Sequence, residues 1–319
     1  MGKDPSPGLT VLSVNSRQPP GRRPHPVSFT GPGGVRLAGE GLGDPDQSPV
    51  LFLHGAGQTR HAWGAAAETL AGAGWYTIAL DLRGHGDSDW PDADGYTVDA
   101  FAGDVLAVID ALGEPPAVVG ASLGGLAALA AQGATTRQLF RALVLVDVTP
   151  RLEPAGVGRV VGFMAAHPEG FASLDEAAAA VARYLPDRAP RKDITGLSRV
   201  LRQAPDGRYR WRWDPRLLGA IGDLAGGDPE TITHRTDEIA ALLTQAARRV
   251  QVPTLIIRGA LSDVISGEGV AEFLEAVPHA DSVEIGGAGH MVAGDRNDAF
   301  RTAVVAFLNE LPPAKGSPP

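Results

Sequence analysis

The sequence predicts an α/β protein built on a doubly wound, mostly parallel β-sheet, and three observations predict this class. Short apolar runs alternate with longer segments in which apolar residues recur at helical spacing. Several of the runs are uninterrupted, such as Val50–Leu53, as in strands that are buried on both faces. Glycine-rich and polar motifs follow directly after such runs, and sites of parallel sheets lie at the carboxyl ends of the strands.

The strands and helices are expected in a regular order along the chain. A hairpin comes first, because Val27–Thr30 and Val35–Gly39 flank the turn-forming residues GPGG. Further strands are expected at 50–53, 76–80, 117–119, 143–146, 254–257 and 282–285. Helices are expected at 62–71, at 96–112, directly after residue 122, and at 297–308.

One long segment interrupts this alternation. Strand-like runs vanish after Pro150, and helical pieces with several tryptophan, arginine and proline residues take their place. We therefore expect a helical cap inserted after the sixth core strand, where it would cover a pocket at the carboxyl ends of the strands. The expected parts are a flexible leader at 1–25, a core at 26–149 and 248–312, the cap at 150–247, and a C-terminal tail at 313–319.

The composition restricts the partners of the chain. Its net charge is −9, from 28 basic and 37 acidic side chains, and it has no basic stripe of the kind that binds nucleic acid. No apolar run approaches the ~20 residues of a membrane span, and the leader lacks the apolar centre of a signal peptide. We expect a soluble, cytoplasmic protein with no nucleic-acid or membrane partner, and a homodimer stays open. Because cysteines and metal-ligand motifs are missing from the sequence, no metal or other cofactor is expected.

The stretch Gly120-Ala121-Ser122-Leu123-Gly124 fits the pattern G-x-S-x-G, with a predicted strand before it and a predicted helix after it. So sharp a turn strains the serine backbone and leaves little room for side chains on its neighbours. The hydroxyl would then stand at the N-terminus of a helix, where negative charge is stabilised. Since small residues are also common in ordinary turns, Ser122 can be a nucleophile only if the chain supplies catalytic partners.

A serine nucleophile needs a base, and His290 is the best placed of the eight histidines. It lies in IGGAGHMV, after the last predicted strand, and therefore at the same sheet edge as the serine turn. The other histidines lie in the leader, in helical or surface contexts, or after earlier strands. Among these, His54 precedes a glycine and is expected to prop a loop.

The base in turn needs an acid that fixes its tautomer. Asp263 follows a late strand and precedes a helix, and it gives the chain order Ser122, Asp263, His290 that accompanies the G-x-S-x-G pattern. We therefore expect Asp263 to be the acid. Asp147 is the alternative, because it also ends a predicted strand, and its structural interpretation is a helix cap or an anchor of the inserted segment.

Two backbone amides are expected to form an oxyanion hole, which stabilises the negative oxygen of a tetrahedral intermediate. Leu123, directly after the serine, supplies one amide, and Ala56, in the loop after an earlier strand, supplies the other. Gly55 and Gly57 would let this loop approach a substrate closely. The same loop could also be a plain strand-ending turn.

Together these motifs resemble the landmarks of the α/β-hydrolase superfamily over residues 26–312. The residues that carry the resemblance are His54-Gly55-Ala56, Asp81-Leu82-Arg83-Gly84-His85-Gly86-Asp87-Ser88, Gly120-Ala121-Ser122-Leu123-Gly124, Asp263 and Gly289-His290. The chain is most similar to the branch of cofactor-free haloperoxidase-like esterases and epoxide hydrolases, which implies the α/β-hydrolase fold. Epoxide hydrolases and haloalkane dehalogenases of this branch use an aspartate where this chain has Ser122, so their activities are not implied.

The residues and the resemblance predict a carboxylesterase-like serine hydrolase that cleaves an ester of a small or medium-sized organic molecule through an acyl-enzyme. The same triad could hydrolyse a lactone, a thioester, an amide or a carbon–carbon bond, with perhydrolysis as a side activity. Another class, a non-hydrolytic ligand-binding protein or a cofactor-free lyase or oxygenase, could also use this fold.

Substrate choice is expected to depend on the inserted segment. Its candidate pocket residues are Phe163, Met164, Trp211 and Trp213, although plain packing between cap and core would explain them equally well. In the loop DLRGHGDSDW, Arg83 and Asp87 are expected to form a structural ion pair near the site.

Overall fold

The computed structural model describes residues 10–11, 23–185, 195–219, 229–291 and 298–311. Its main sheet has the strand order β1-β2-β3-β5-β4-β6-β7-β10-β11. The strands are β1 (Thr10–Val11), β2 (His25–Thr30), β3 (Arg36–Leu42), β4 (Pro49–Leu53), β5 (Tyr76–Leu80), β6 (Ala117–Ala121), β7 (Ala142–Val146), β10 (Thr254–Gly259) and β11 (Ala280–Ile285). Neighbours from β5 to β11 are parallel, whereas β1, β2, β3 and β5 pair antiparallel. The predicted mostly parallel sheet is therefore confirmed.

The central strands are apolar throughout because both of their faces are covered. In β4, Leu51 and Leu53 join the hydrophobic core on one side of the sheet, while Val50 and Phe52 join the core on the other. Every residue of β4, β6 and β7 is buried. Strands of this kind carry their polar groups just beyond their ends, so the chemistry of the sheet collects at its edge.

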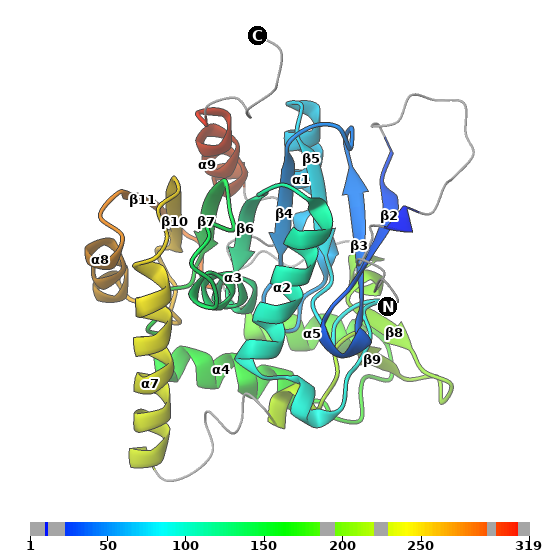
Figure 1. Cartoon of the computed structure of the whole chain (residues 1–319). Coiled ribbons are helices and arrows are strands. Elements are labelled where there is room, and N and C mark those ends of the chain that lie inside the picture. The colour runs from blue at the N-terminus through cyan, green and yellow to red at the C-terminus, as the bar shows by residue number, and fades with distance from the viewer. Residues whose placement is uncertain (1–9, 12–22, 186–194, 220–228, 292–297, 312–319) are drawn as a thin grey trace, which may run out of the picture.

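Helices cover both faces of the sheet (Figure 1). On one face, α1 (Gly64–Gly72) packs against α9 (Asp298–Asn309). On the other, α2 (Val98–Leu112) packs against α3 (Leu123–Gly133), α3 against α7 (Pro229–Ala247), and α7 against α8 (Gly267–Ala276). The 3-10 helices are η1 (Pro32–Gly34), η2 (Arg60–Trp63), η3 (Ala93–Gly95) and η4 (Thr195–Arg199). Within the described ranges, no helix combines the length and the apolar character that crossing a membrane requires.

The segment between β7 and β10 differs from the expected helical cap. It contains α4 (Pro154–Ala165), α5 (Leu174–Tyr184), η4 and a hairpin of β8 (Leu201–Gln203) and β9 (Tyr209–Trp211), followed by α7. Figure 1 shows α4, α5 and the hairpin beyond the end of the sheet toward which β4 and β6 point. Helix α7 instead packs on the core, where a Cβ placed on Gly133 would lie 2.8 Å from the Cβ of Ala246. The part over the carboxyl ends is thus mixed helix and strand, and it ends before α7.

The leader expected at 1–25 contributes to the sheet. Thr10–Val11 forms the edge strand β1 against β2, and His25 is the first residue of β2. A strand edge with free backbone groups favours such pairing. The rest of the expected leader up to residue 22, and the tail at 313–319, lie outside the described residues.

Candidate active site

Ser122 lies in the turn between β6 and α3 with a strained backbone. Its φ is 46° and its ψ is −118°, a combination that residues with side chains rarely adopt. The flanking glycines are a steric requirement of this turn. A Cβ on Gly120 would lie 2.7 Å from the Cα of Gly125, and a Cβ on Gly124 would lie 2.3 Å from the carbonyl oxygen of Leu53. The strand, turn and helix expected around the motif are all present.

The turn is fixed on both sides by backbone hydrogen bonds. The amide of Ser122 donates to the carbonyl of Val146 at 3.1 Å, which ties the turn to the end of β7. The carbonyl of Ser122 accepts from the amide of Leu126 at 3.0 Å, as the first hydrogen bond of α3. The positive end of the α3 dipole therefore lies at Ser122, where it stabilises developing negative charge.

Asp147 follows β7 directly and holds His290. The Nδ1 atom of His290 lies 2.7 Å from Oδ2 of Asp147, whose side chain is completely buried. Asp147 has a φ of 50°, and Ser122 is the only other described non-glycine residue with a positive φ. Strained residues tend to cluster at functional sites, and these two end neighbouring parallel strands.

Asp263 pairs with an arginine and not with His290, which contradicts the expectation that it is the acid. Its carboxylate forms a two-point ion pair with Arg159 of α4, at 2.6 Å from Nε and 2.7 Å from Nη2, and its side chain is 40% exposed. The chain turns after β10 so that Asp263 meets the inserted segment. The carboxylate that contacts the imidazole is the alternative one, Asp147.

Ser262 is the residue that sequence reasoning missed. Its hydroxyl donates to Oδ2 of Asp147 at 2.5 Å, and the amide of Gly259 donates to Oδ1 at 2.8 Å. Both oxygens of the buried carboxylate are thus hydrogen-bonded, which stabilises its charge and fixes it against His290. Ser262 follows a late strand, which is the same signal that favoured Asp263. No motif in the sequence distinguishes this serine from an ordinary loop residue.

The loop after β4 approaches the serine closely. A Cβ placed on Gly55 would lie 3.2 Å from the Cβ of Ser122. In the same loop, Gln58 donates from Nε2 to the sulfur of Met291 at 3.3 Å, so the loop also borders the residue after His290. Loops from β4, β6, β7 and β11 therefore converge at one edge of the sheet.

Two amides at this edge have no acceptor within the described part of the chain. Across the residues that the structure describes, neither the amide of Ala56 nor that of Leu123 donates a hydrogen bond. Free amides beside a serine are what oxyanion stabilisation requires. The hydroxyl of Ser122 also forms no hydrogen bond with His290 in the described chain, and in unliganded enzymes this contact often closes only with substrate.

His54 props this loop, as the sequence predicts. Its Nε2 accepts from the amide of Leu82 at 3.1 Å, so the proton of the neutral ring is on Nδ1, which donates to the carbonyl of Gly55 at 2.8 Å. Burial lowers the pKa of His54 to about 4, and the ring is therefore neutral at pH 7.

His85 holds the loop from the other side. The amide of Gly57 donates to its Nε2 at 3.2 Å, and its Nδ1–H donates to the carbonyl of Arg83 at 2.9 Å. Burial, and next the nearby ring of His54 at 4.9 Å, lower the pKa of His85 to about 3. The loop after β4 is thus held by two neutral imidazoles.

The candidate pocket residues pack against the same loop, and three of them, Phe163, Trp211 and Trp213, form an aromatic row. A Cβ on Gly57 would lie 3.5 Å from the side chains of both Met164 and Trp213. The ring of Trp213 stacks on Trp211 at 4.7 Å, and Trp211 lies 5.7 Å from Phe163. Met164, Trp211 and Trp213 are buried. These contacts show that the four residues pack together at the site, and a role in substrate binding stays a prediction.

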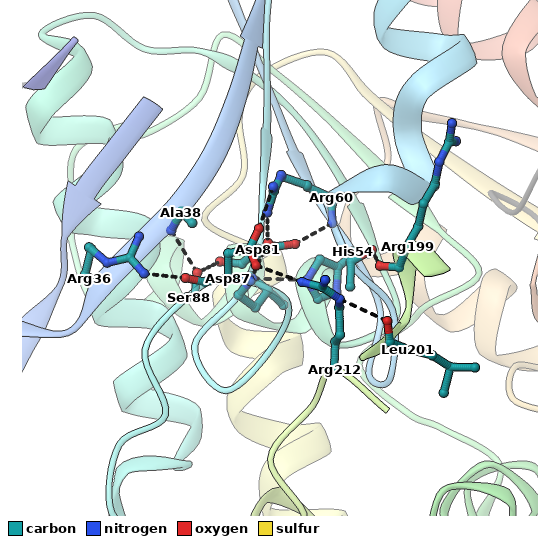
Figure 2. Close-up of polar contacts among 12 residues, drawn as sticks. Arg36, Ala38, His54, Arg60, Asp81, Asp87, Ser88, Arg199, Leu201 and Arg212 are labelled. Atoms are coloured by element: carbon teal, nitrogen blue, oxygen red, sulfur yellow. Dashed lines mark hydrogen bonds and ion pairs between the residues drawn. The ribbon is translucent and has the colours of Figure 1, made fainter. Parts of the chain in front are cut away.

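The loop of residues 81–89 is held by a polar network with partners other than those expected, and Figure 2 shows the part of it around Asp81 and Asp87. Arg83 pairs with the buried Asp104 of α2, at 2.6 Å from both Nε and Nη2, and does not pair with Asp87. Asp87 instead accepts from Arg60 at 2.7 Å and from Arg212 at 2.8 Å. The loop is therefore tied to α2, to η2 and to the inserted segment at once.

Comparison with known proteins gives the class of the chain. The model of the Alpha/beta hydrolase family matches residues 50–303, so the chain belongs to this family, and the predicted superfamily is confirmed. It is 30% identical over 275 residues to the 3-hydroxybutyrate-oligomer hydrolase of Cupriavidus necator, over 83% of this chain and 90% of that protein. It is 31% identical over 276 residues to an esterase of Mycobacterium tuberculosis, over 82% of each.

A solved structure agrees with the fold. The crystal structure of E-2-(acetamidomethylene)succinate hydrolase has a TM-score of 0.74 and 24% sequence identity, over 89% of this chain and 100% of that chain. At that identity the likeness concerns the fold. The family model and the two relatives identify this chain as a hydrolase, and the solved structure agrees with its α/β-hydrolase fold.

Proposed function

We propose that this protein is a serine hydrolase that cleaves a carboxylic ester of a small or medium-sized organic molecule through an acyl-enzyme. One observation carries the proposal. The strained Ser122 at the head of α3 adjoins two amides that have no acceptor in the described chain. The buried carboxylate of Asp147, which follows the neighbouring strand β7, holds His290. This is the set of groups that acyl transfer by serine needs.

In the proposed first half-reaction, Nε2 of His290 takes the proton of the Ser122 hydroxyl while the oxygen attacks the ester carbonyl. The carbonyl oxygen becomes negative and accepts hydrogen bonds from the amides of Ala56 and Leu123. Asp147 keeps the proton of the imidazole on Nδ1 and stabilises the imidazolium. The carbon–oxygen bond to the alcohol then breaks, and His290 returns its proton to the leaving alkoxide.

In the proposed second half-reaction, a water molecule replaces the alcohol. His290 takes a proton from the water, whose oxygen attacks the acyl carbonyl. The bond to Ser122 breaks, and the serine oxygen recovers the proton from the imidazolium. The carboxylic acid leaves, and the enzyme regains its starting state.

Two kinds of evidence support an ester as the substrate. The relatives at 30% and 31% identity are named as an oligomer hydrolase and as an esterase. The residue at the proposed nucleophile position is also a serine, Ser122, whereas alkyl transfer of the epoxide-hydrolase type would need an aspartate there. The aromatic row of Phe163, Trp211 and Trp213 favours an apolar or aromatic portion of the ester.

A fluorophosphonate probe tests the nucleophile directly. We expect covalent labelling of the wild-type protein, none in Ser122→Ala, and hydrolysis of p-nitrophenyl acetate that is lost in the same variant. The variant His290→Ala should retain the fold and lose hydrolysis by at least ~10³-fold. Labelling that survives in Ser122→Ala, or esterase activity that persists in both variants, would overturn the proposal.

A further inference from the structure

The loop after β4 is held at three successive peptide groups by side chains. The amide of Gly55 donates to Oε1 of Gln58 at 3.0 Å. The carbonyl of Gly55 accepts from Nδ1 of His54 at 2.8 Å. The amide of Gly57 donates to Nε2 of His85 at 3.2 Å. A loop without regular secondary structure thus has its backbone orientation set by three side chains in a row.

These bonds determine where the amide of Ala56 points. The carbonyl of Gly55 and the N–H of Ala56 belong to one peptide group, which is planar and trans, so the two point in opposite directions. Because the carbonyl of Gly55 is hydrogen-bonded to the His54 ring, the N–H of Ala56 points away from that ring. The next peptide group, which carries the N–H of Gly57, is fixed by His85 at a glycine φ of 75°.

His85 also connects this loop to the inserted segment. Its backbone forms a bridge with Trp213, and the neighbouring hydrogen bonds run from Gly86 to Arg212 at 2.7 Å and from Asp214 to Gly84 at 2.8 Å. Arg212 additionally forms an ion pair with Asp87, in the loop of residues 81–89 that also carries His85, as Figure 2 shows. The backbone of residue 85 is thus paired with the residues that directly follow β9.

We propose that His85 is a positioning residue that fixes the loop after β4 through Gly57 and couples the orientation of that loop to residues 212–214 of the inserted segment. The inference rests on the proposed function, because that function gives the Ala56 amide its task. His85 touches no reacting atom in this arrangement, and its effect passes through the Ala56–Gly57 peptide group. The side chain of Trp213 lies against Gly57, so the inserted segment contacts the loop after β4 directly as well.

The acceptor role depends on a neutral ring. A protonated imidazole carries N–H on both nitrogens, and its Nε2–H would oppose the N–H of Gly57. Burial lowers the pKa of His85 to about 3, which keeps Nε2 available as an acceptor across the physiological range. The Nδ1–H of His85 donates to the carbonyl of Arg83, so the neutral ring has the single tautomer in which Nε2 is the acceptor.

Two variants separate positioning from plain packing. His85→Gln keeps an acceptor oxygen at the position of Nε2, whereas His85→Asn keeps only a donor at the position of Nδ1. We expect kcat for a p-nitrophenyl ester to fall by about 10–100-fold in His85→Asn with KM within about 3-fold, because the oxyanion donor is misaligned in the transition state. In His85→Gln we expect kcat to stay close to the wild-type value, because the acceptor at the position of Nε2 is retained.

Inhibition by a boronic acid, which forms a tetrahedral adduct, should weaken in His85→Asn by a factor similar to the fall in kcat. Equal kcat in His85→Asn and the wild type, or equal losses in both variants that follow their melting temperatures, would overturn the inference. Ser122→Ala is measured in parallel. Hydrolysis that persists in Ser122→Ala contradicts the proposed function, whereas a dead Ser122→Ala with a normal His85→Asn contradicts only the role of His85.

Discussion

The Nδ1 atom of His290 lies 2.7 Å from Oδ2 of Asp147, at the end of β7. The amide of Ser122 is bound to the carbonyl of Val146, the residue just before this aspartate. Ser122 and Asp147 therefore follow the ends of adjacent parallel strands, which lie about 4.8 Å apart. The carboxylate that contacts His290 therefore follows β7, the strand next to the serine turn, and not β10, after which Asp263 was expected to supply it.

This relationship predicts which aspartate matters for catalysis. Asp147→Asn should lower kcat for a p-nitrophenyl ester by about 10³–10⁴-fold, because the amide no longer stabilises the imidazolium or selects its tautomer. Steady-state kinetics at pH 8 measure the effect, and circular dichroism verifies that the variant is folded.

The matched control is Asp263→Asn. Its partner Arg159 is 43% exposed, and exposed ion pairs contribute at most about 1 kcal/mol to stability, so kcat should stay within about 3-fold of the wild type. A severe loss in Asp263→Asn with a mild one in Asp147→Asn would return the role of the acid to Asp263.

Ser262→Ala should weaken both the fold and the reaction. The variant removes the hydroxyl that donates to Asp147 at 2.5 Å, and hydrogen bonds to charged groups contribute about 1.5–3 kcal/mol. We expect a decrease of that order in the free energy of unfolding in urea, together with a fall in kcat of about 10-fold. Ser266→Ala is the control, since its hydroxyl caps α8 at the amide of Gly269, and it should cost about 1 kcal/mol and leave kcat unchanged.

Gly124→Ala tests the steric requirement of the serine turn. The new Cβ would lie 2.3 Å from the carbonyl oxygen of Leu53, so the variant should lose about 3 kcal/mol or more of stability, or fail to fold. Gly158→Ala in α4 is the matched control, because no described atom lies within 4 Å of the position that its methyl group would take. It should gain about 0.5–1 kcal/mol from helix propensity. Similar melting temperatures for the two variants would contradict this reading of the turn.

The buried histidines predict a loss of stability in acid. Both folded-state pKa values, about 4 for His54 and about 3 for His85, lie below the ordinary value of 6.5. Below pH 6.5 the unfolded chain binds these protons and the folded chain does not, so each group removes up to about 1.4 kcal/mol per pH unit until its folded pKa is reached. The stabilisation is therefore complete above pH 6.5 and is lost progressively toward pH 4 and 3.

Urea unfolding at pH 7, 6, 5 and 4 measures this dependence. His85→Gln should reduce the slope between pH 6 and 4 by about one proton. An identical slope in His85→Gln and the wild type would show that His85 is not held neutral in the folded chain.

Much of the sheet could be predicted because local signals specify it. The uninterrupted apolar runs that became β4, β6 and β7 need cover on both faces, and the glycines around Ser122 exclude anything but a tight turn. The hairpin β8–β9 was missed, since its strands are three residues long and lie among arginines and tryptophans without alternation.

The sequence by itself determined the fold, the serine turn and the histidine after the last strand, because each depends on a local pattern of apolar, small or polar residues. Only the tertiary structure shows which of Asp147 and Asp263 contacts His290. Both end parallel strands and both suit the chain order, but the contact with His290 depends on how the loop after β10 turns, and that loop presents Ser262 to Asp147 and Asp263 to Arg159. Such a choice is made by packing between segments distant in sequence, which no local pattern records.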